Sequence, residues 1–134
     1  MKRELQDAVL PRADAGRLLA EPSPEEALGA SRLLDFLEEH LFEEVIPFWE
    51  RVGPDPGGGF NTCLAEDGTL ISDNKFLWGQ WRAAWVFARL YNSFGPEPRW
   101  LDIAERTAAF AIQHGWDTSV SGWRSRLAAD GRER

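Results

Sequence analysis

The sequence contains little that could cross-link the protein, anchor it in a membrane or hold a metal. Its single cysteine, Cys63, cannot form an internal disulfide, and there is no cluster of Cys and His residues of the kind that binds zinc. No stretch of about 18 residues is apolar enough to span a bilayer, and the first residues lack the apolar run of a secretory signal. The net charge is -7, with acidic and basic residues interspersed, so no basic face is available to a nucleic acid. We therefore expect a cytoplasmic protein with no nucleic-acid partner, no membrane partner, and no metal or other cofactor.

The aromatic residues are unusual in kind. The chain has Trp 7 against Tyr 1 and Met 1, within a composition that is 43% hydrophobic and 28% charged. These proportions are typical of soluble globular proteins. Large rings fill cores, but they also provide apolar platforms on which the C-H faces of sugars stack. Composition alone leaves both uses open.

The first predicted helix follows a segment with no sustained pattern. Residues 1–22 carry scattered leucines, prolines and charges, and we expect a loosely ordered leader there, with residues 23–134 forming part of a helical domain. Ser23, Pro24 and the glutamates that follow form a capping box, which predicts a helix start. The helix should run to about Ile46 and end at Pro47. Apolar residues spaced by three or four positions predict one buried face, made of Leu33, Phe36, Leu37, Leu41, Val45 and Phe48.

Two further helices are predicted in the second half of the chain. One begins at Asp73, a good N-cap, and continues without proline up to Gly95. It is apolar on more than one face, which predicts that much of it is buried. The next begins at Pro98 and ends at His114-Gly115.

A repeated loop pattern follows the first and third of these helices. After a glycine-rich stretch at 53–59, short alternation around Asp67-Gly68 predicts a β-hairpin, and the same pattern returns around Asp130-Gly131, 63 residues later. Helical hairpins with decorated loops on one rim are the components of an α/α toroid. The helix that would correspond to the second one should begin just beyond Arg134, so we expect a truncated repeat with helical circular dichroism and weak thermal cooperativity. The alternative is a complete small three-helix domain.

The second helix carries the sharpest candidate site. Lys75, Trp78, Arg82 and Trp85 are spaced i, i+3, i+7 and i+10, so all four should share one helical face. A guanidinium buried among aromatic rings must meet a carboxylate, a carbonyl oxygen or a ligand. The row could face the lumen of a toroid and bind a sugar, or Arg82 could be structural. The spacing leaves both interpretations open.

The remaining polar residues indicate structural roles. His40 lies on the apolar face of the first helix and His114 at the end of the third, and neither has an acid or base at a useful spacing. Cys63 is most simply a small buried strand residue. The second helix also lacks the pair of carboxylates that a glycoside hydrolase of the α/α-barrel type would need.

Several motifs in order resemble the N-acylglucosamine 2-epimerase and cellobiose 2-epimerase family. They lie between about Leu33 and Gly131, and they are PFWE at 47–50, GGGF at 57–60, the turn at Asp67-Gly68, KFLWGQWR at 75–82, and SGW ending at Trp123. Related mannose and sulfoquinovose isomerases look similar. The resemblance covers about three quarters of this chain and about a third of a typical member. One departure is Ser121-Gly122, where the family usually has two glycines.

The resemblance implies a fold and a reaction. It implies an all-α fold that forms part of an (α/α)6 barrel, with small β-hairpins on one rim, acting as an isomerase through proton abstraction and return by way of an enediolate. Arg82 would be the catalytic cation, and Trp78, with Lys75 and Trp85, would bind the sugar substrate. The histidines that move the proton would lie in later repeats, so the fragment itself is expected to be inactive. A homodimer of the complete protein is one assembly left open. The competing hypothesis is a noncatalytic helical-repeat module that binds carbohydrate or protein.

Overall fold

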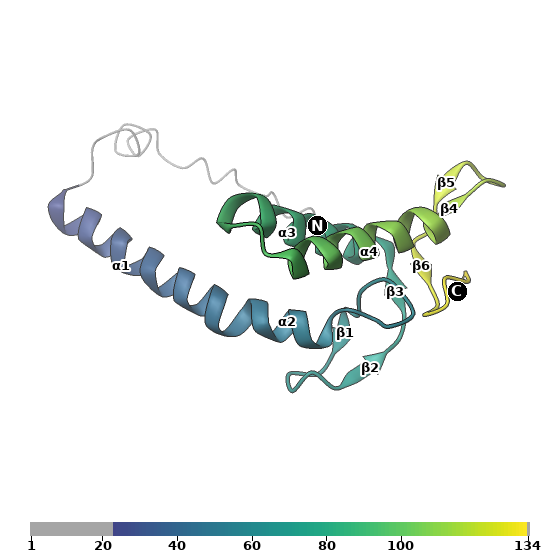
Figure 1. The fold of residues 1–134 in the computed structure, drawn as a ribbon, viewed down its shortest axis with the longest axis horizontal. Coiled ribbons are helices and arrows are strands. Elements are labelled where there is room, and N and C mark those ends of the chain that lie inside the picture. The colour runs from purple at the N-terminus through teal and green to yellow at the C-terminus, as the bar shows by residue number, and fades with distance from the viewer. Residues whose placement is uncertain (1–22, 134) are drawn as a thin grey trace, which may run out of the picture. The chain divides into compact units, whose positions relative to one another are not determined.

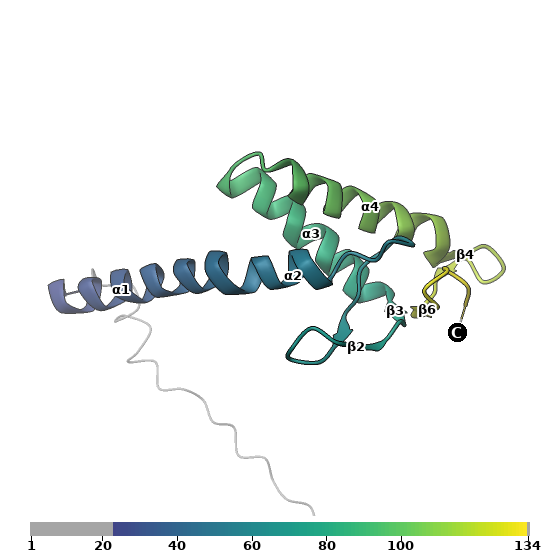
Figure 2. The ribbon, with the colours of Figure 1, turned by 60° about the horizontal axis from the view of Figure 1, so that its bottom comes forward.

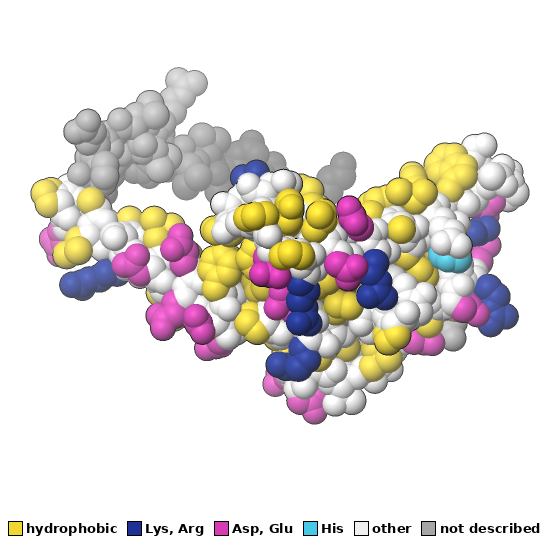
Figure 3. All heavy atoms as spheres, viewed as in Figure 1, with side chains coloured by type: hydrophobic (Ala, Val, Ile, Leu, Met, Phe, Trp, Pro, Cys, Tyr) yellow, Lys and Arg dark blue, Asp and Glu magenta, His cyan; other side chains and the backbone are white. Residues whose placement is uncertain are grey.

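The computed structural model describes residues 23–133, which are divided along the chain into two compact units, with the division between His40 and Leu41. The expected leader, residues 1–22, lies outside the described residues. No helix within 23–133 combines the length and the hydropathy needed to cross a membrane. On the face that Figure 3 shows, Lys and Arg side chains lie in small groups between acidic and apolar ones.

The described part of the first unit is a single helix, α1 (Pro24–His40). Its capping box is confirmed, because the Ser23 N-H donates to Glu26 Oε2 at 2.9 Å and the Glu26 N-H donates to Ser23 Oγ at 3.3 Å. The expected burial of its apolar face is wrong for this structure, since α1 has no buried residue. The side chains of Leu33, Phe36 and Leu37 are 57%, 61% and 49% exposed.

Helical backbone continues past Pro47, contrary to the expected stop. Residues Leu41–Val45 form a π-helical turn, η2, and Ile46–Val52 form α2, which is capped at Gly53. Pro47 is the second residue of α2, which directly follows the π turn, and as a proline it has no N-H to donate to that turn. A π turn is rare and occurs mostly as a single turn inside an α-helix, where it shifts the bonding by one residue. The backbone is helical on both sides of Pro47, so the proline does not end the helix.

A short hairpin and a pair of long helices follow. The hairpin pairs β1 (Cys63–Leu64) with β2 (Leu70–Ser72) antiparallel, as predicted. Helices α3 (Leu77–Phe94) and α4 (Pro98–Gly115) lie side by side in both views, joined by a short turn (Figures 1 and 2). The end of α3 and both ends of α4 are as predicted.

The start of α3 differs from the prediction, because a strand takes up the residues before it. Strand β3 (Lys75–Phe76) pairs antiparallel with β6 (Arg126–Leu127), so the helix begins four residues later than Asp73 indicated. Beyond α4, β4 (Trp116–Asp117) pairs with β5 (Gly122–Trp123). The β3-β6 pairing joins residues about 50 positions apart, which no local pattern could predict.

The core of the unit that begins at Leu41 consists of two clusters. The larger one is formed by Ile46, Phe60, Ala83, Phe87, Leu90, Ile103 and Ala104. The smaller one is formed by Leu77, Phe110, Ala111 and Leu127. Both clusters draw on α3, which confirms that this helix is substantially buried.

The internal repeat is confirmed at its hairpin turns. In the first turn the Ala65 N-H donates to the Thr69 carbonyl at 2.9 Å, and in the second the Ala128 N-H donates to the Arg132 carbonyl at 2.7 Å. The glycine of each turn has a positive φ, 90° in the first and 81° in the second. The aspartate before each glycine accepts a hydrogen bond from the backbone N-H two residues later. Two segments 63 residues apart therefore fold alike.

Candidate functional site

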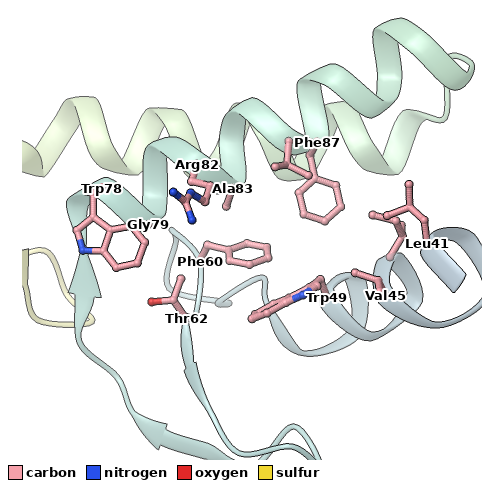
Figure 4. Close-up of a pocket in the computed structure, with 12 residues that line it drawn as sticks. Leu41, Val45, Trp49, Phe60, Thr62, Trp78, Gly79, Arg82, Ala83 and Phe87 are labelled. Carbon is pink, nitrogen blue, oxygen red and sulfur yellow. The ribbon is translucent and has the colours of Figure 1, made fainter. Parts of the chain in front are cut away.

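A cavity of about 390 Å³ opens between α2, α3 and the chain that leads into β1 (Figure 4). Nearly all of its walls are apolar, and its only polar side chains are an arginine and a threonine. The lining residues are Leu41, Val45, Ile46, Trp49, Phe60, Thr62, Trp78, Gly79, Arg82, Ala83, Val86 and Phe87.

The structure brings Trp78 and Arg82 together at this cavity. They lie one turn apart on α3, and the Arg82 Cζ atom is 5.5 Å from the centroid of the Trp78 ring, a cation-π contact. Arg82 is exposed, so the desolvation cost expected for a buried guanidinium does not arise. Among residues 23–133, no carboxylate or carbonyl oxygen accepts a hydrogen bond from it. Its N-H groups are therefore available to a ligand.

The inner wall of the cavity is a packed set of aromatic rings. The Phe60 side chain is only 3% exposed, and its ring centroid lies 5.9 Å from that of Trp49 and 5.8 Å from that of Phe87. Trp49 and Phe60 stand in the motifs PFWE and GGGF, but the sequence alone assigns them no role. The position of Phe60 directly after the glycine-rich segment is the only local signal for its place in the wall.

Lys75 is not on the helical face where the spacing placed it. It lies in β3, its side chain is fully buried, and its Nζ atom donates to Asp55 Oδ2 at 2.6 Å and to Asn61 Oδ1. These two acceptors satisfy an ammonium that would otherwise be costly to bury. The contacts of Lys75 thus indicate a structural role in holding the loop that precedes β1.

The carboxylate that pairs with Lys75 is stabilised in its charged form. Burial alone raises the pKa of Asp55, but the Lys75 hydrogen bond, the Gly57 N-H and the charges of Lys75 and Arg106 outweigh it. The net effect holds the pKa of Asp55 below its ordinary value of 3.8. Asp55 is therefore an ion-pair anchor and a poor candidate for a general base near neutral pH.

The other predicted residues lie away from the cavity lining. Trp85 is 67% exposed on α3, and its substrate role stays a prediction. His40 stacks on Phe36 in α1 with ring centroids 6.0 Å apart, while His114 lies 4.9 Å from the Phe110 ring at the end of α4. Within 23–133, no group of three Cys, His, Asp or Glu side chains is placed to share a metal ion.

Comparison with known families identifies the family of this chain. A family model described as N-acylglucosamine 2-epimerase (GlcNAc 2-epimerase) matches residues 58–134, more than half of the chain, and the match includes Phe60, Trp78 and Arg82. The chain belongs to the N-acylglucosamine 2-epimerase family. The resemblance seen in the sequence is thereby confirmed, and the family is one of carbohydrate epimerases.

Curated relatives within the N-acylglucosamine 2-epimerase family include mammalian and bacterial enzymes. The N-acylglucosamine 2-epimerase of Mus musculus is 42% identical over 79 residues, covering 57% of this chain and 19% of the relative. The cellobiose 2-epimerase of Dictyoglomus turgidum is 32% identical over 88 residues, covering 63% of this chain and 22% of the relative. The chain thus spans about a fifth of the length of the curated relatives it matches.

Solved structures of cellobiose 2-epimerases share the helical fold. The enzyme of Spirochaeta thermophila superposes with a TM-score of 0.72 at 24% sequence identity, over 84% of this chain and 28% of that one. The enzyme of Bacillus thermoamylovorans gives a TM-score of 0.67 at 18% identity, over 78% of this chain and 27% of that one. These likenesses establish a helix-rich fold of the kind found in the family. The individual roles of Arg82, Trp78, Lys75 and Trp85 stay predictions.

Proposed function

We propose that this chain is the N-terminal part of a sugar 2-epimerase or aldose-ketose isomerase, and that its helices form part of an (α/α)6 barrel. Family membership and the names of the relatives support the reaction class, and the fold likeness supports the barrel. The substrate class is a sugar of the N-acylglucosamine, cellobiose or mannose type, bound in its open-chain form.

The chemistry of such a reaction gives a role to a cation at the cavity that has no oxygen partner among residues 23–133. Removing the proton next to the carbonyl of an open-chain sugar produces an enediolate, and negative charge develops on its oxygen. A preorganised donor at that oxygen lowers the barrier. Arg82 presents N-H groups that no oxygen among residues 23–133 occupies, at the edge of a largely apolar pocket. Its proposed role is to stabilise this oxyanion.

Trp78 adds a stacking surface beside that cation. Its ring is 62% exposed and already holds the Arg82 guanidinium through the cation-π contact. The placement of Arg82 over Trp78 at the mouth of an apolar cavity is the observation that carries the proposal.

The cavity of this chain supplies binding groups but no proton shuttle. None of its twelve lining residues is a His, Asp, Glu, Lys or Cys, the usual general acids and bases. We therefore propose that the groups that move the proton come from outside this lining. The 134-residue chain alone is then expected to bind sugar without turning it over.

Sugar binding by the chain tests the proposal. Mannose, N-acetylmannosamine and cellobiose are titrated while tryptophan fluorescence and indole NMR signals are followed. Arg82→Ala should weaken binding, and Arg82→Lys should restore only part of it, because a lysine lacks the planar fork of donors. Arg89→Ala is the matched control, since Arg89 is exposed on the same helix and does not line the cavity. Equal loss in the Arg82 and Arg89 variants would mean that only net charge matters.

The activity of the complete protein gives the second readout. Exchange of the sugar C2 proton with deuterium, followed by NMR, should fall by about 10²–10³ in Arg82→Ala, the usual cost of removing an oxyanion donor. A wild-type exchange rate in that variant would remove Arg82 from the mechanism.

A further inference from the structure

A fully buried carboxamide on α3 is paired with the backbone of a residue that lines the cavity. Gln80 has no exposed side-chain surface, and its carboxamide is paired with the backbone of one residue. The Phe60 N-H donates to Gln80 Oε1 at 2.7 Å, and Gln80 Nε2 donates to the Phe60 carbonyl at 2.9 Å. A side chain on α3 thus holds a strand-like segment 20 residues away in sequence, much as a neighbouring β-strand would.

The segment held by this pair lies unusually close to α3. A Cβ atom at Gly59 would be 2.8 Å from Gln80 Oε1, and one at Gly79 would be 3.2 Å from Thr62 Cγ2. Both distances are shorter than ordinary carbon contacts, so each glycine permits an approach that a side chain would block. The segment from Gly59 to Thr62 is therefore fixed to the helix at successive points.

That segment supplies both the apolar and the polar part of one cavity wall. Phe60 contributes the buried ring, and Thr62 contributes the only hydroxyl among the lining residues. Arg82 and Trp78 lie on α3, the helix against which this segment packs, so Thr62 lies close to Gly79 and to the pair on either side of it (Figure 4). A ligand with several oxygens can therefore meet the Thr62 hydroxyl and the Arg82 guanidinium in one cavity.

We propose that Gln80 is a positioning residue, which fixes the Phe60–Thr62 wall against α3 and thereby places the Thr62 side chain beside the Trp78–Arg82 pair for sugar binding. The sugar part of this inference rests on the proposed function. Without the carboxamide, the Phe60 N-H and carbonyl would be left in a buried site with no partner, and the segment would move to find water. An apolar residue of equal volume could fill the space but could not form the two hydrogen bonds that fix Phe60 against α3.

Two substitutions separate positioning from mere filling of the core. Gln80→Met keeps the volume and removes both hydrogen bonds. Gln80→Glu keeps the shape of the native side chain. When protonated, its carboxyl group can accept from the Phe60 N-H and donate to the Phe60 carbonyl, as the carboxamide does. When ionised, the carboxylate cannot donate. Burial raises the pKa of such a glutamate, so its switch should fall above the ordinary range for Glu. Ile103→Val is the control for a modest loss of packing in the core cluster that also contains Phe60, without loss of the Gln80 hydrogen bonds.

The experiment measures the position of the Phe60–Thr62 wall and the affinity for sugar separately in the 134-residue chain. The contact between the Thr62 methyl and the Gly79 Hα, seen as a nuclear Overhauser effect, and hydrogen exchange at the Phe60 amide report the wall without any ligand. The mannose dissociation constant reports binding. In Gln80→Met we expect loss of the contact, faster Phe60 exchange and about tenfold weaker binding. Ile103→Val should keep all three.

The pH series supplies the decisive comparison. Gln80→Glu should behave like the wild type at low pH and like Gln80→Met at high pH, while the wild type and Ile103→Val show no such switch over the same range. Retention of the contact and of mannose affinity in Gln80→Met overturns the proposal, and so does a Gln80→Glu chain that shows no recovery at low pH, including one that stays unfolded there. A wild-type chain that binds no sugar overturns the proposed function, and the ligand-free readouts then decide whether Gln80 holds the wall.

Discussion

How much an ion pair stabilises this chain depends more on the burial of its two side chains than on the distance between their charged atoms. Lys75 and Asp55 approach to 2.6 Å with side-chain exposures of 0% and 17%, and Arg132 and Asp130 approach to the same 2.6 Å with exposures of 84% and 51%. Removing one partner of a buried pair leaves an uncompensated charge, whereas an exposed pair is largely replaced by water. The two pairs therefore form a matched comparison.

The first prediction concerns these two pairs. Lys75→Met should lower the free energy of unfolding by about 3–5 kcal/mol, because Asp55 and Asn61 lose the group that they hold. Arg132→Ala should leave it unchanged within error. Urea unfolding followed by circular dichroism measures both. Similar losses in the two variants would show that the Lys75 pair is far better hydrated in solution than its burial indicates.

The second prediction is a pH dependence that arises from Asp55. Its pKa is lower in the folded chain than the ordinary value of 3.8, so the unfolded state binds the proton more readily. The stabilisation is fully present above about pH 4 and is lost as the pH falls through the folded pKa. Urea midpoints should be lower at about pH 3 than at about pH 6 in the wild type, with the loss falling below about pH 4, and the difference should be smaller in Asp55→Asn. An identical drop in both chains would assign the acid sensitivity to other carboxylates.

At the scale of the element, sequence patterns predict most helix ends but not the helix that continues past Pro47 or the start of α3. The capping box at Ser23, the end of α3 and the whole of α4 follow from local chemistry, since caps, prolines and glycines act within one turn. The helix continues past Pro47 through a π turn that has no sequence signature. The start of α3 lies later than Asp73 because Lys75 and Phe76 pair with β6, a tertiary contact.

In the candidate site, too, contacts within one helix can be predicted from the sequence, whereas contacts with a distant loop cannot. The pairing of Trp78 with Arg82 is a consequence of i, i+4 spacing within one helix, so the sequence could predict it. Lys75 fails the same argument because it precedes the helix. The contributions of Phe60, Thr62 and Gln80 depend on a loop that folds back onto α3, and no periodicity reports that contact.

The third prediction compares two glycines that sit in different elements. At Gly59, φ is 74°, and an added Cβ would lie 2.9 Å from Phe110 Cδ1 as well as close to Gln80, so Gly59→Ala should destabilise the chain by at least about 1–2 kcal/mol. At Gly29, within α1, an added Cβ meets nothing within 4 Å. Gly29→Ala should therefore stabilise α1 by up to about 1 kcal/mol through helix propensity alone. Urea midpoints and helical circular dichroism report the two effects, and a loss of helicity in Gly29→Ala would contradict the open surroundings of that residue.

At the scale of the whole molecule, the two units differ in how much of their own side-chain surface is buried in a core. Helices α3 and α4 share core residues with each other and with the chain before β1, whereas the 17 residues of α1 bury none of their side chains. In proteins most of the stability of a helix comes from tertiary packing of its apolar face rather than from helix propensity. The stability of this chain should therefore be uneven along its length.

Hydrogen exchange tests that unevenness and is the last prediction. Amides of α3 and α4 should be the slowest to exchange, because opening them disrupts the core, while those of α1 should exchange nearly as fast as in a free peptide. The same difference predicts a broad melt, in which the helical signal of α1 is lost before the cooperative loss from α3 and α4. If α1 were instead protected as strongly as α3, its exposed Leu33, Phe36 and Leu37 side chains would have to be covered in solution. Repeating the exchange at several protein concentrations would then distinguish a second copy, whose protection falls on dilution, from a contact within one chain, whose protection does not.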